Sequence, residues 1–269
     1  MTTQAPLPRR FQLSRVGELT FDIVRRDFVT SYGLAVAILI VPTVLKSVLF
    51  RGQLQSMAAP APGRFPSVFG AGFFLAGFIG LLASLLVYAA LSWRAVERLQ
   101  GRAATPGAML EAAFRALPVL IAVAILGYFA IVFATLLLIF PALMLATAWL
   151  VVVPAAACEK TGVFRTFGRS AELTKGHRWA VFWLLVVLWV ASLIVIVLAA
   201  LVIRAIFGLS GNIFMVQPSG PFGYVALVLQ MLVSAVVYVV FGTGVGVVFQ
   251  ELRALKGGFD TQRLSEVFA

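Results

Sequence analysis

Residues 118–158 read PVLIAVAILGYFAIVFATLLLIFPALMLATAWLVVVPAAAC, a stretch without a single charged side chain. As one α-helix it would be roughly 60 Å long, about twice the thickness of membrane hydrocarbon. Proline cannot donate a hydrogen bond to the preceding turn, so Pro141 predicts a tight reversal that makes two membrane spans of the stretch. A single long tilted helix is the alternative. Both alternatives, two spans or one long helix, predict that this stretch is helical and surrounded by lipid.

The rest of the chain has the same character. Hydrophobic residues make up 62% of it and charged residues 12%, whereas a soluble domain carries about 25% charged residues. Apolar runs long enough to cross a bilayer occupy Tyr32–Phe50, Val68–Leu91, Leu117–Phe140, Ala142–Cys158, Trp179–Ile203 and Phe222–Phe249. The sequence therefore predicts an all-α, polytopic membrane helix bundle with six transmembrane helices. We expect one integral membrane domain over residues 1–269, with a cytoplasmic tail and interfacial helix at 1–28, the transmembrane bundle at 29–254 and a cytoplasmic tail at 255–269.

The net charge of +11 is distributed unevenly about these spans. All but four of the 21 lysines and arginines fall on one side of the predicted membrane; the exceptions are Lys46, Arg51, Arg64 and Arg204. Because lysine and arginine are retained on the cytoplasmic side, both termini are predicted to be cytoplasmic in a multi-pass protein of the cell inner (plasma) membrane. The cations flank membrane spans, whereas a nucleic-acid site would need a basic surface without such spans, so no nucleic-acid partner is predicted. Membrane lipids are the expected partners.

Short amphipathic stretches precede each pair of spans. Val16–Phe28, Thr105–Leu117 and the segment after Thr161 alternate apolar and charged faces at helical period. Helices of this kind lie in the membrane interface, so three interfacial amphipathic helices are predicted. The order suggests a threefold pseudo-repeat over residues 11–98, 105–158 and 161–254. The alternative is that juxtamembrane helices are simply common.

Groups for catalysis are scarce. The chain has one histidine and one cysteine, no metal-ligand spacing and no ionisable residue in the middle of a span. We therefore predict no enzyme activity, no metal and no cofactor. Glu97, Glu111, Glu159 and Glu172 are interleaved with arginines, which favours ion pairs over an active site. A membrane-embedded enzyme would need these groups to cluster.

Polar and small side chains form a track along the last span. Its members are Gln230, Ser234 and Tyr238, followed by the Gly242–Gly246 pair, and Gly80 and Ser84 repeat the small-residue spacing in the second span. Small residues four apart let helices approach closely and let polar side chains find partners across the contact. The track predicts a packing seam, with a substrate path as the alternative.

The segment between spans four and five is the most distinctive part of the chain. It has Pro154 near the end of a span, Glu159 directly after it, and Leu173-Thr174-Lys175-Gly176 before the next span. This pattern, with the upstream stretch Arg94–Leu117, resembles the membrane domain attached to some bacterial glycerophosphodiester phosphodiesterases, and similar stand-alone bacterial membrane proteins. The resemblance implies a multispan module without catalytic residues of its own, because the hydrolase of the fused relatives is a separate soluble barrel.

The same segment supplies a basic rim. Its candidate contacts to anionic lipid headgroups or to a protein partner are Glu159, Arg165, Arg169, Lys175 and Arg178. Each cation near the surface is worth about 1 kcal/mol of attraction to anionic lipid. Topology and anchoring alone are the alternative role. The sequence thus favours a nonenzymatic scaffold or accessory protein, with a small transporter or lipid-translocating protein as the second hypothesis.

Overall fold

The computed structural model describes residues 12–49, 71–137, 139–159, 162–208 and 220–267, and these residues form α-helices without strands. The helices are α1 (Leu13–Leu49), α3 (Ala71–Leu99), α4 (Pro106–Leu137), α5 (Ile139–Ala148), α6 (Val152–Glu159), α7 (Val163–Thr174), α8 (Arg178–Phe207) and α9 (Gly220–Val267). Six helical segments are long and apolar enough to cross a membrane. The predicted all-α class and the number of apolar spans are therefore confirmed.

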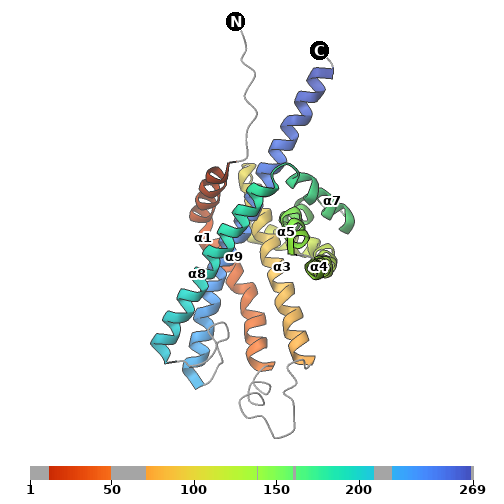
Figure 1. The fold of residues 1–269 in the computed structure, drawn as a ribbon. Coiled ribbons are helices and arrows are strands. Elements are labelled where there is room, and N and C mark those ends of the chain that lie inside the picture. The colour runs from red at the N-terminus through yellow and green to blue at the C-terminus, as the bar shows by residue number, and fades with distance from the viewer. Residues whose placement is uncertain (1–11, 50–70, 138, 160–161, 209–219, 268–269) are drawn as a thin grey trace.

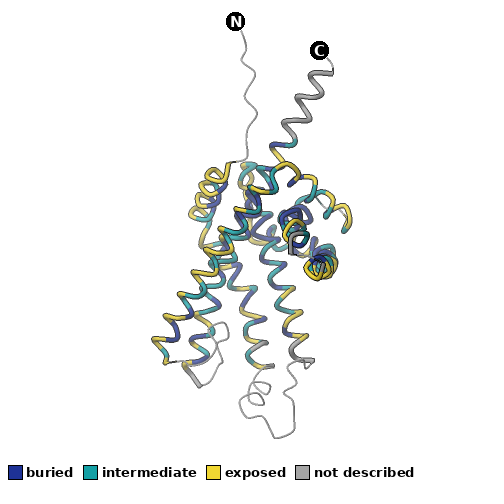
Figure 2. Tube along the Cα trace, viewed as in Figure 1, coloured by how far each residue is buried: buried dark blue, intermediate teal, exposed yellow. Residues whose placement is uncertain are grey.

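The outer surface of these helices is apolar. Large side chains that are mostly exposed include Leu136 (80%), Ile206 (69%) and Phe133 (64%). Figure 2 shows exposed positions along the outer faces of the long helices. Contiguous apolar surface of this extent is a liability in water but is what lipid chains contact in a membrane. The described residues thus have the surface of a multi-pass membrane protein.

Four helices run in one general direction. Figure 1 shows α1, α3, α8 and α9 lengthwise, with α1, α3 and α9 packed together and α8 against α9. The helices α4 and α5 pack on each other and are seen close to end on, so this hairpin crosses the other four at a steep angle. Its main contact with the bundle is that of α4 with α3, and α5 also contacts α8.

Small residues make up much of the core. Ala35, Ala90, Ala113 and Ala235, from four different helices, are completely buried. Because lipid chains are as apolar as the protein interior, membrane helices associate through close packing, and small side chains allow it. The core therefore depends on shape complementarity between helices.

The boundaries of several helices differ from those predicted. Residues 1–11 of the predicted tail lie outside the described residues. The predicted amphipathic stretch Val16–Phe28 and the first span are two helical segments joined within α1 across a kink at Asp27 (φ −117°, ψ 19°). The second amphipathic stretch continues into the third span within α4, and α9 continues past residue 254 to Val267. Pro118 lies inside α4 without ending it, as neighbouring helices in a membrane allow. The third amphipathic stretch is a separate helix, α7.

The apolar stretch at 118–158 is divided between α4 and α5, as the reversal predicted, with Pro141 in the first turn of α5. Proline is favoured there because N–H groups in the first turn of a helix have no acceptor within the helix, so the N–H that proline lacks is not missed. A second division was not predicted: residues 149–151 form a turn between α5 and α6. Pro154 accounts for it, since its ring clashes with the carbonyl four residues earlier, at Leu150. The fourth span, predicted as one helix, is therefore broken.

Candidate functional site

The break in the fourth span is covered by α7. The Ser170 hydroxyl donates a hydrogen bond to the Ala148 carbonyl at 2.8 Å, and the Thr174 hydroxyl lies 3.4 Å from the same oxygen. Within the turn, the ring of Trp149 packs on that of Phe167, with the two centroids 4.6 Å apart. A carbonyl freed at a helix break in an apolar environment is costly unless it finds a donor. The hydroxyl groups of α7 supply that donor.

The buried face of α7 was missed by sequence reasoning. Helical spacing in the stretch after Thr161 places the apolar residues Phe164, Phe167 and Ala171 on one face, yet Phe164 is 82% exposed. The buried side chains are instead Thr166, Ser170, Leu173 and Thr174. The signal that could have found them is the hydroxyl repeat at 166, 170 and 174, which places three short polar side chains on one helical face.

We expect the double substitution Ser170→Ala with Thr174→Val to lower the free energy of unfolding by about 2 kcal/mol. The buried Ala148 carbonyl loses its Ser170 donor and also the nearby Thr174 hydroxyl, which lies closer still to the Ser170 and Ala171 carbonyls. Unfolding of the detergent-solubilised chain, followed by circular dichroism, measures the effect. Ser84→Ala is the matched control, since the Ser84 hydroxyl donates only within its own helix, to Leu81. An equal loss in both proteins would contradict the role of the α7 hydroxyls.

Glu159 and Arg169 of the predicted basic rim are paired with each other. The Arg169 Nε lies 3.0 Å and 3.2 Å from the two Glu159 carboxylate oxygens, and the Arg253 Nε approaches the same carboxylate at 4.0 Å. Partial burial alone would lower the pKa of Arg169, but its hydrogen bonds to Glu159 and Glu172 outweigh burial and raise it. This pair ties α6 to α7 and, through Arg253, toward α9. It stabilises the protein internally rather than forming a free rim.

The other three members of the rim are placed differently. Arg165 and Lys175 are exposed on α7 and just after it. Arg178, at the start of α8, is half-buried and lines a cavity of about 600 Å³. The structure therefore does not bring the five predicted residues together as one surface. It separates them into an internal pair, two exposed cations and one cation at a cavity.

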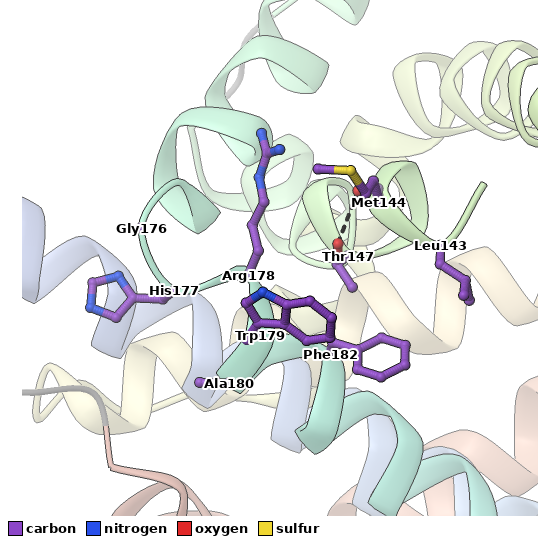
Figure 3. A pocket seen from close by; sticks show the side chains of 9 residues that line it. All are labelled: Leu143, Met144, Thr147, Gly176, His177, Arg178, Trp179, Ala180 and Phe182. Carbon is purple, nitrogen blue, oxygen red and sulfur yellow. Dashed lines mark hydrogen bonds between the residues drawn. The ribbon is translucent and has the colours of Figure 1, made fainter. Parts of the chain in front are cut away.

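The cavity of Arg178 lies between α5 and the first turns of α8 (Figure 3). Leu143, Met144 and Thr147 line it from α5, and Trp179 and Phe182 line it from α8. The Thr147 hydroxyl is used within α5, where it donates to the Met144 carbonyl at 2.9 Å. In Figure 3 the Arg178 side chain extends away from the rings of Trp179 and Phe182. The cavity thus has one cationic end and one aromatic end.

Most of the predicted polar track surrounds a second cavity of about 270 Å³, between α1, α3 and α9. Gly80, Gln230, Ser234 and Tyr238 all line it, and Pro42 lines it from α1. The Gln230 Oε1 atom is buried and has no hydrogen-bond partner among the described residues. The structure therefore brings these track residues together at a polar cavity within the apolar helices.

The glycine pair lies nearer the other end of α9 and faces α3. A Cβ atom on Gly246 would stand 2.6 Å from the Ser92 carbonyl oxygen and 2.8 Å from the Ala95 Cβ. On Gly242 it would stand 3.0 Å from the Leu91 Cβ. Both glycines therefore pack directly against the neighbouring helix, with no room for a side chain at Gly246.

A buried ion pair between α1 and α3 was not predicted. Asp27, at the kink of α1, accepts from Arg94 at 3.0 Å and from Arg98 at 2.7 Å, and Arg94 also donates to the Ser31 hydroxyl at 3.0 Å. The Arg94 side chain is only 3% exposed. The available signal was the four-residue spacing of polar side chains in both segments, which places each pair on one helical face.

The four glutamates considered for an enzyme fall into two groups. Glu97 and Glu111 line a cavity of about 450 Å³ together with Cys158, and each is ion-paired, to Arg102 and Arg115 respectively. Glu159 and Glu172 both lie next to Arg169 of α7. Among the described helices, no three His, Cys, Asp or Glu side chains gather as metal ligands. Each carboxylate serves an ion pair.

Comparison with known proteins adds no relative: no protein-family model, curated protein or solved structure matches this chain.

Proposed function

We propose that the chain is a nonenzymatic accessory protein of the inner membrane that contacts anionic lipid headgroups through α7 at the cytoplasmic face. The observation that carries this proposal is the way α7 is held. One face is fixed to the broken fourth span by Ser170 and Thr174, while Phe164 and Arg165 are exposed. A fixed helix that presents an aromatic ring and a cation is suited to the boundary between acyl chains and headgroups.

The charge distribution supports this orientation. The cation-rich start of α1, the end of α3, the start of α8 and the far end of α9 lie toward the same end of the molecule in Figure 1. That end also contains the ion pairs of Asp27, Glu159 and Glu251. Because cations are retained on the inner side of membranes, we propose that this end is cytoplasmic. We also propose that the three amphipathic stretches lie at the membrane interface and that the chain has a threefold pseudo-repeat.

We expect a reporter that is active only in the cytoplasm to be active when it is fused to either end of the chain, because each end lies next to a cation-rich segment. A reporter that is active only outside the membrane should be inactive at the same two positions. Activity of the outside reporter at either end would contradict the proposed orientation.

Lipid contact is tested with the full chain in vesicles that contain brominated phosphatidylglycerol or brominated phosphatidylcholine. Bromine on acyl chains quenches tryptophan, so quenching reports which lipid surrounds the protein. We expect Arg165→Gln and Lys175→Gln each to reduce the preference for the anionic lipid by about fivefold at low salt. Arg25→Gln is the control, an exposed cation of α1 away from α7. An equal effect of Arg25→Gln would assign the preference to net charge and refute a role of α7.

A small transporter or lipid-translocating protein is the second candidate, and the polar cavity at Gln230 favours it. Such a function predicts movement of a polar solute or lipid in proteoliposomes, reduced by Gln230→Leu and unchanged by Ser84→Ala. No movement across a broad panel, with folded protein verified, would discard it. The similarity to the membrane domain of glycerophosphodiester phosphodiesterases stays a prediction, and it transfers no phosphodiesterase activity.

A further inference from the structure

The cavity of Arg178 has an amphipathic lining that matches one class of ligand. Its apolar side is formed by Leu143 and Met144 of α5 and by Trp179 and Phe182 of α8. Its cationic side is the Arg178 guanidinium. A ligand that satisfies both sides has an anionic group joined to a hydrocarbon chain.

One hydrogen-bond donor of Arg178, its Nε–H, has no acceptor among the described residues. The Nε atom is buried. A buried donor of a charged group costs free energy when it is left unpaired, and an anionic oxygen is the strongest partner for it. Arg169 illustrates the contrast, because its Nε is paired with Glu159. The covered Nε does not itself face the cavity, but among the described residues no carboxylate forms an ion pair with Arg178, so the side chain that lines the cavity keeps an uncompensated charge.

The cavity opens on the outer surface of the helix bundle. Trp179 is 69% exposed and Leu143 is 43% exposed, so the apolar side opens on the surface that contacts lipid. Its volume of about 600 Å³ lies within the range of ligand sites in proteins. Arg178 also stands at the cation-rich end of the molecule, where anionic headgroups of the cytoplasmic leaflet gather.

We infer that this cavity holds one anionic phospholipid, whose phosphate accepts from Arg178 and whose acyl chain lies between Leu143 and Phe182. This inference rests on the proposed cytoplasmic lipid contact and deepens it. The exposed cations of α7 attract headgroups in general, whereas this site retains a single lipid. The chain would then carry a bound lipid out of the membrane into detergent.

Native mass spectrometry of the purified full chain, extracted in detergent with added phosphatidylglycerol, tests the inference. We expect one phosphatidylglycerol to stay bound, and Arg178→Gln to reduce its retention by about tenfold, the loss of one charge-assisted hydrogen bond. Ala180→Phe fills the cavity without changing charge and should have the same effect. Arg165→Gln should retain the lipid. Millimolar inorganic phosphate should not displace it, because phosphate lacks the acyl chain.

Each other outcome has a definite meaning. Wild-type retention of lipid in both Arg178→Gln and Ala180→Phe would overturn the site, as would a wild-type protein without bound lipid. Equal loss in Arg165→Gln and Arg178→Gln would assign the lipid to surface charge, which overturns the cavity site but leaves the proposed contact of α7 standing. Displacement by phosphate alone would replace the lipid by a simple anion and overturn the inference. If Arg178→Gln does not fold, Ala180→Phe alone decides.

Discussion

Replacing Gly246 by alanine is expected to lower the free energy of unfolding by about 3 kcal/mol. The added Cβ would stand 2.6 Å from the Ser92 carbonyl oxygen and 2.9 Å from the Ser92 Cα. These are backbone atoms of α3 and cannot rotate away, so the two helices must separate along their contact. Overpacking of a close contact typically costs about 1–3 kcal/mol, and the backbone clash places this substitution at the upper end. Titration with a denaturing detergent, followed by circular dichroism, measures the change.

Gly244→Ala is the matched control, with the same substitution two residues away on the same helix. Its Cβ would make ordinary contacts, at 3.7 Å from the Thr20 methyl and 3.8 Å from a Leu188 methyl. Alanine is also the better helix former by about 1 kcal/mol, so this variant should be as stable as the wild type or slightly more stable. Equal stability of the two variants would show that α3 and α9 do not pack as closely as described.

Replacing Asp27 by asparagine is expected to cost about 3–5 kcal/mol, because Arg94 then remains buried without its counter-charge. The loss should also separate α1 from α3, since Asp27 binds both Arg94 and Arg98 of α3. Thermal unfolding of the detergent-solubilised chain measures it. Adding Arg94→Met to this variant should recover part of the stability, because no unpaired charge is then left in the interior.

Asp22→Asn provides the comparison for that prediction. Asp22 pairs with Arg26 one turn away on α1, and both side chains are more than half exposed. Exposed pairs of this kind contribute about 0.5 kcal/mol or less. If Asp27→Asn were as mild as Asp22→Asn, the α1–α3 ion pair would have no structural role.

The helices were predictable because their signal is local. An apolar run of sufficient length needs lipid wherever its neighbours lie, so the six spans followed from the sequence alone. The break at residues 149–151 was missed although Pro154 is visible in the sequence. Hydrophobicity does not change across the break, and a proline inside a membrane helix often leaves it intact, as Pro118 does in α4.

The candidate sites were predictable only in part, because contacts between helices depend on rotation about each helix axis. The glycines of α9 were identified by their spacing, and the structure adds that their partner is α3. The rim residues Glu159 and Arg169 were expected to be available to lipid, yet they bind each other. The partnership of Asp27 with Arg94 joins residues far apart in the sequence, and charge alone does not indicate which pairs meet.

The last helix has a mechanical consequence. With 48 residues, α9 is about 72 Å long, more than twice the ~30 Å of the hydrocarbon layer. Figure 1 shows its far end extending beyond the other helices. An uninterrupted helix resists bending more than an unstructured tether of the same number of residues does. A force applied at Val267 would be transmitted along the helix to its contact with α3 at Gly246. A partner attached at Val267 would be held at a fixed distance from the bilayer.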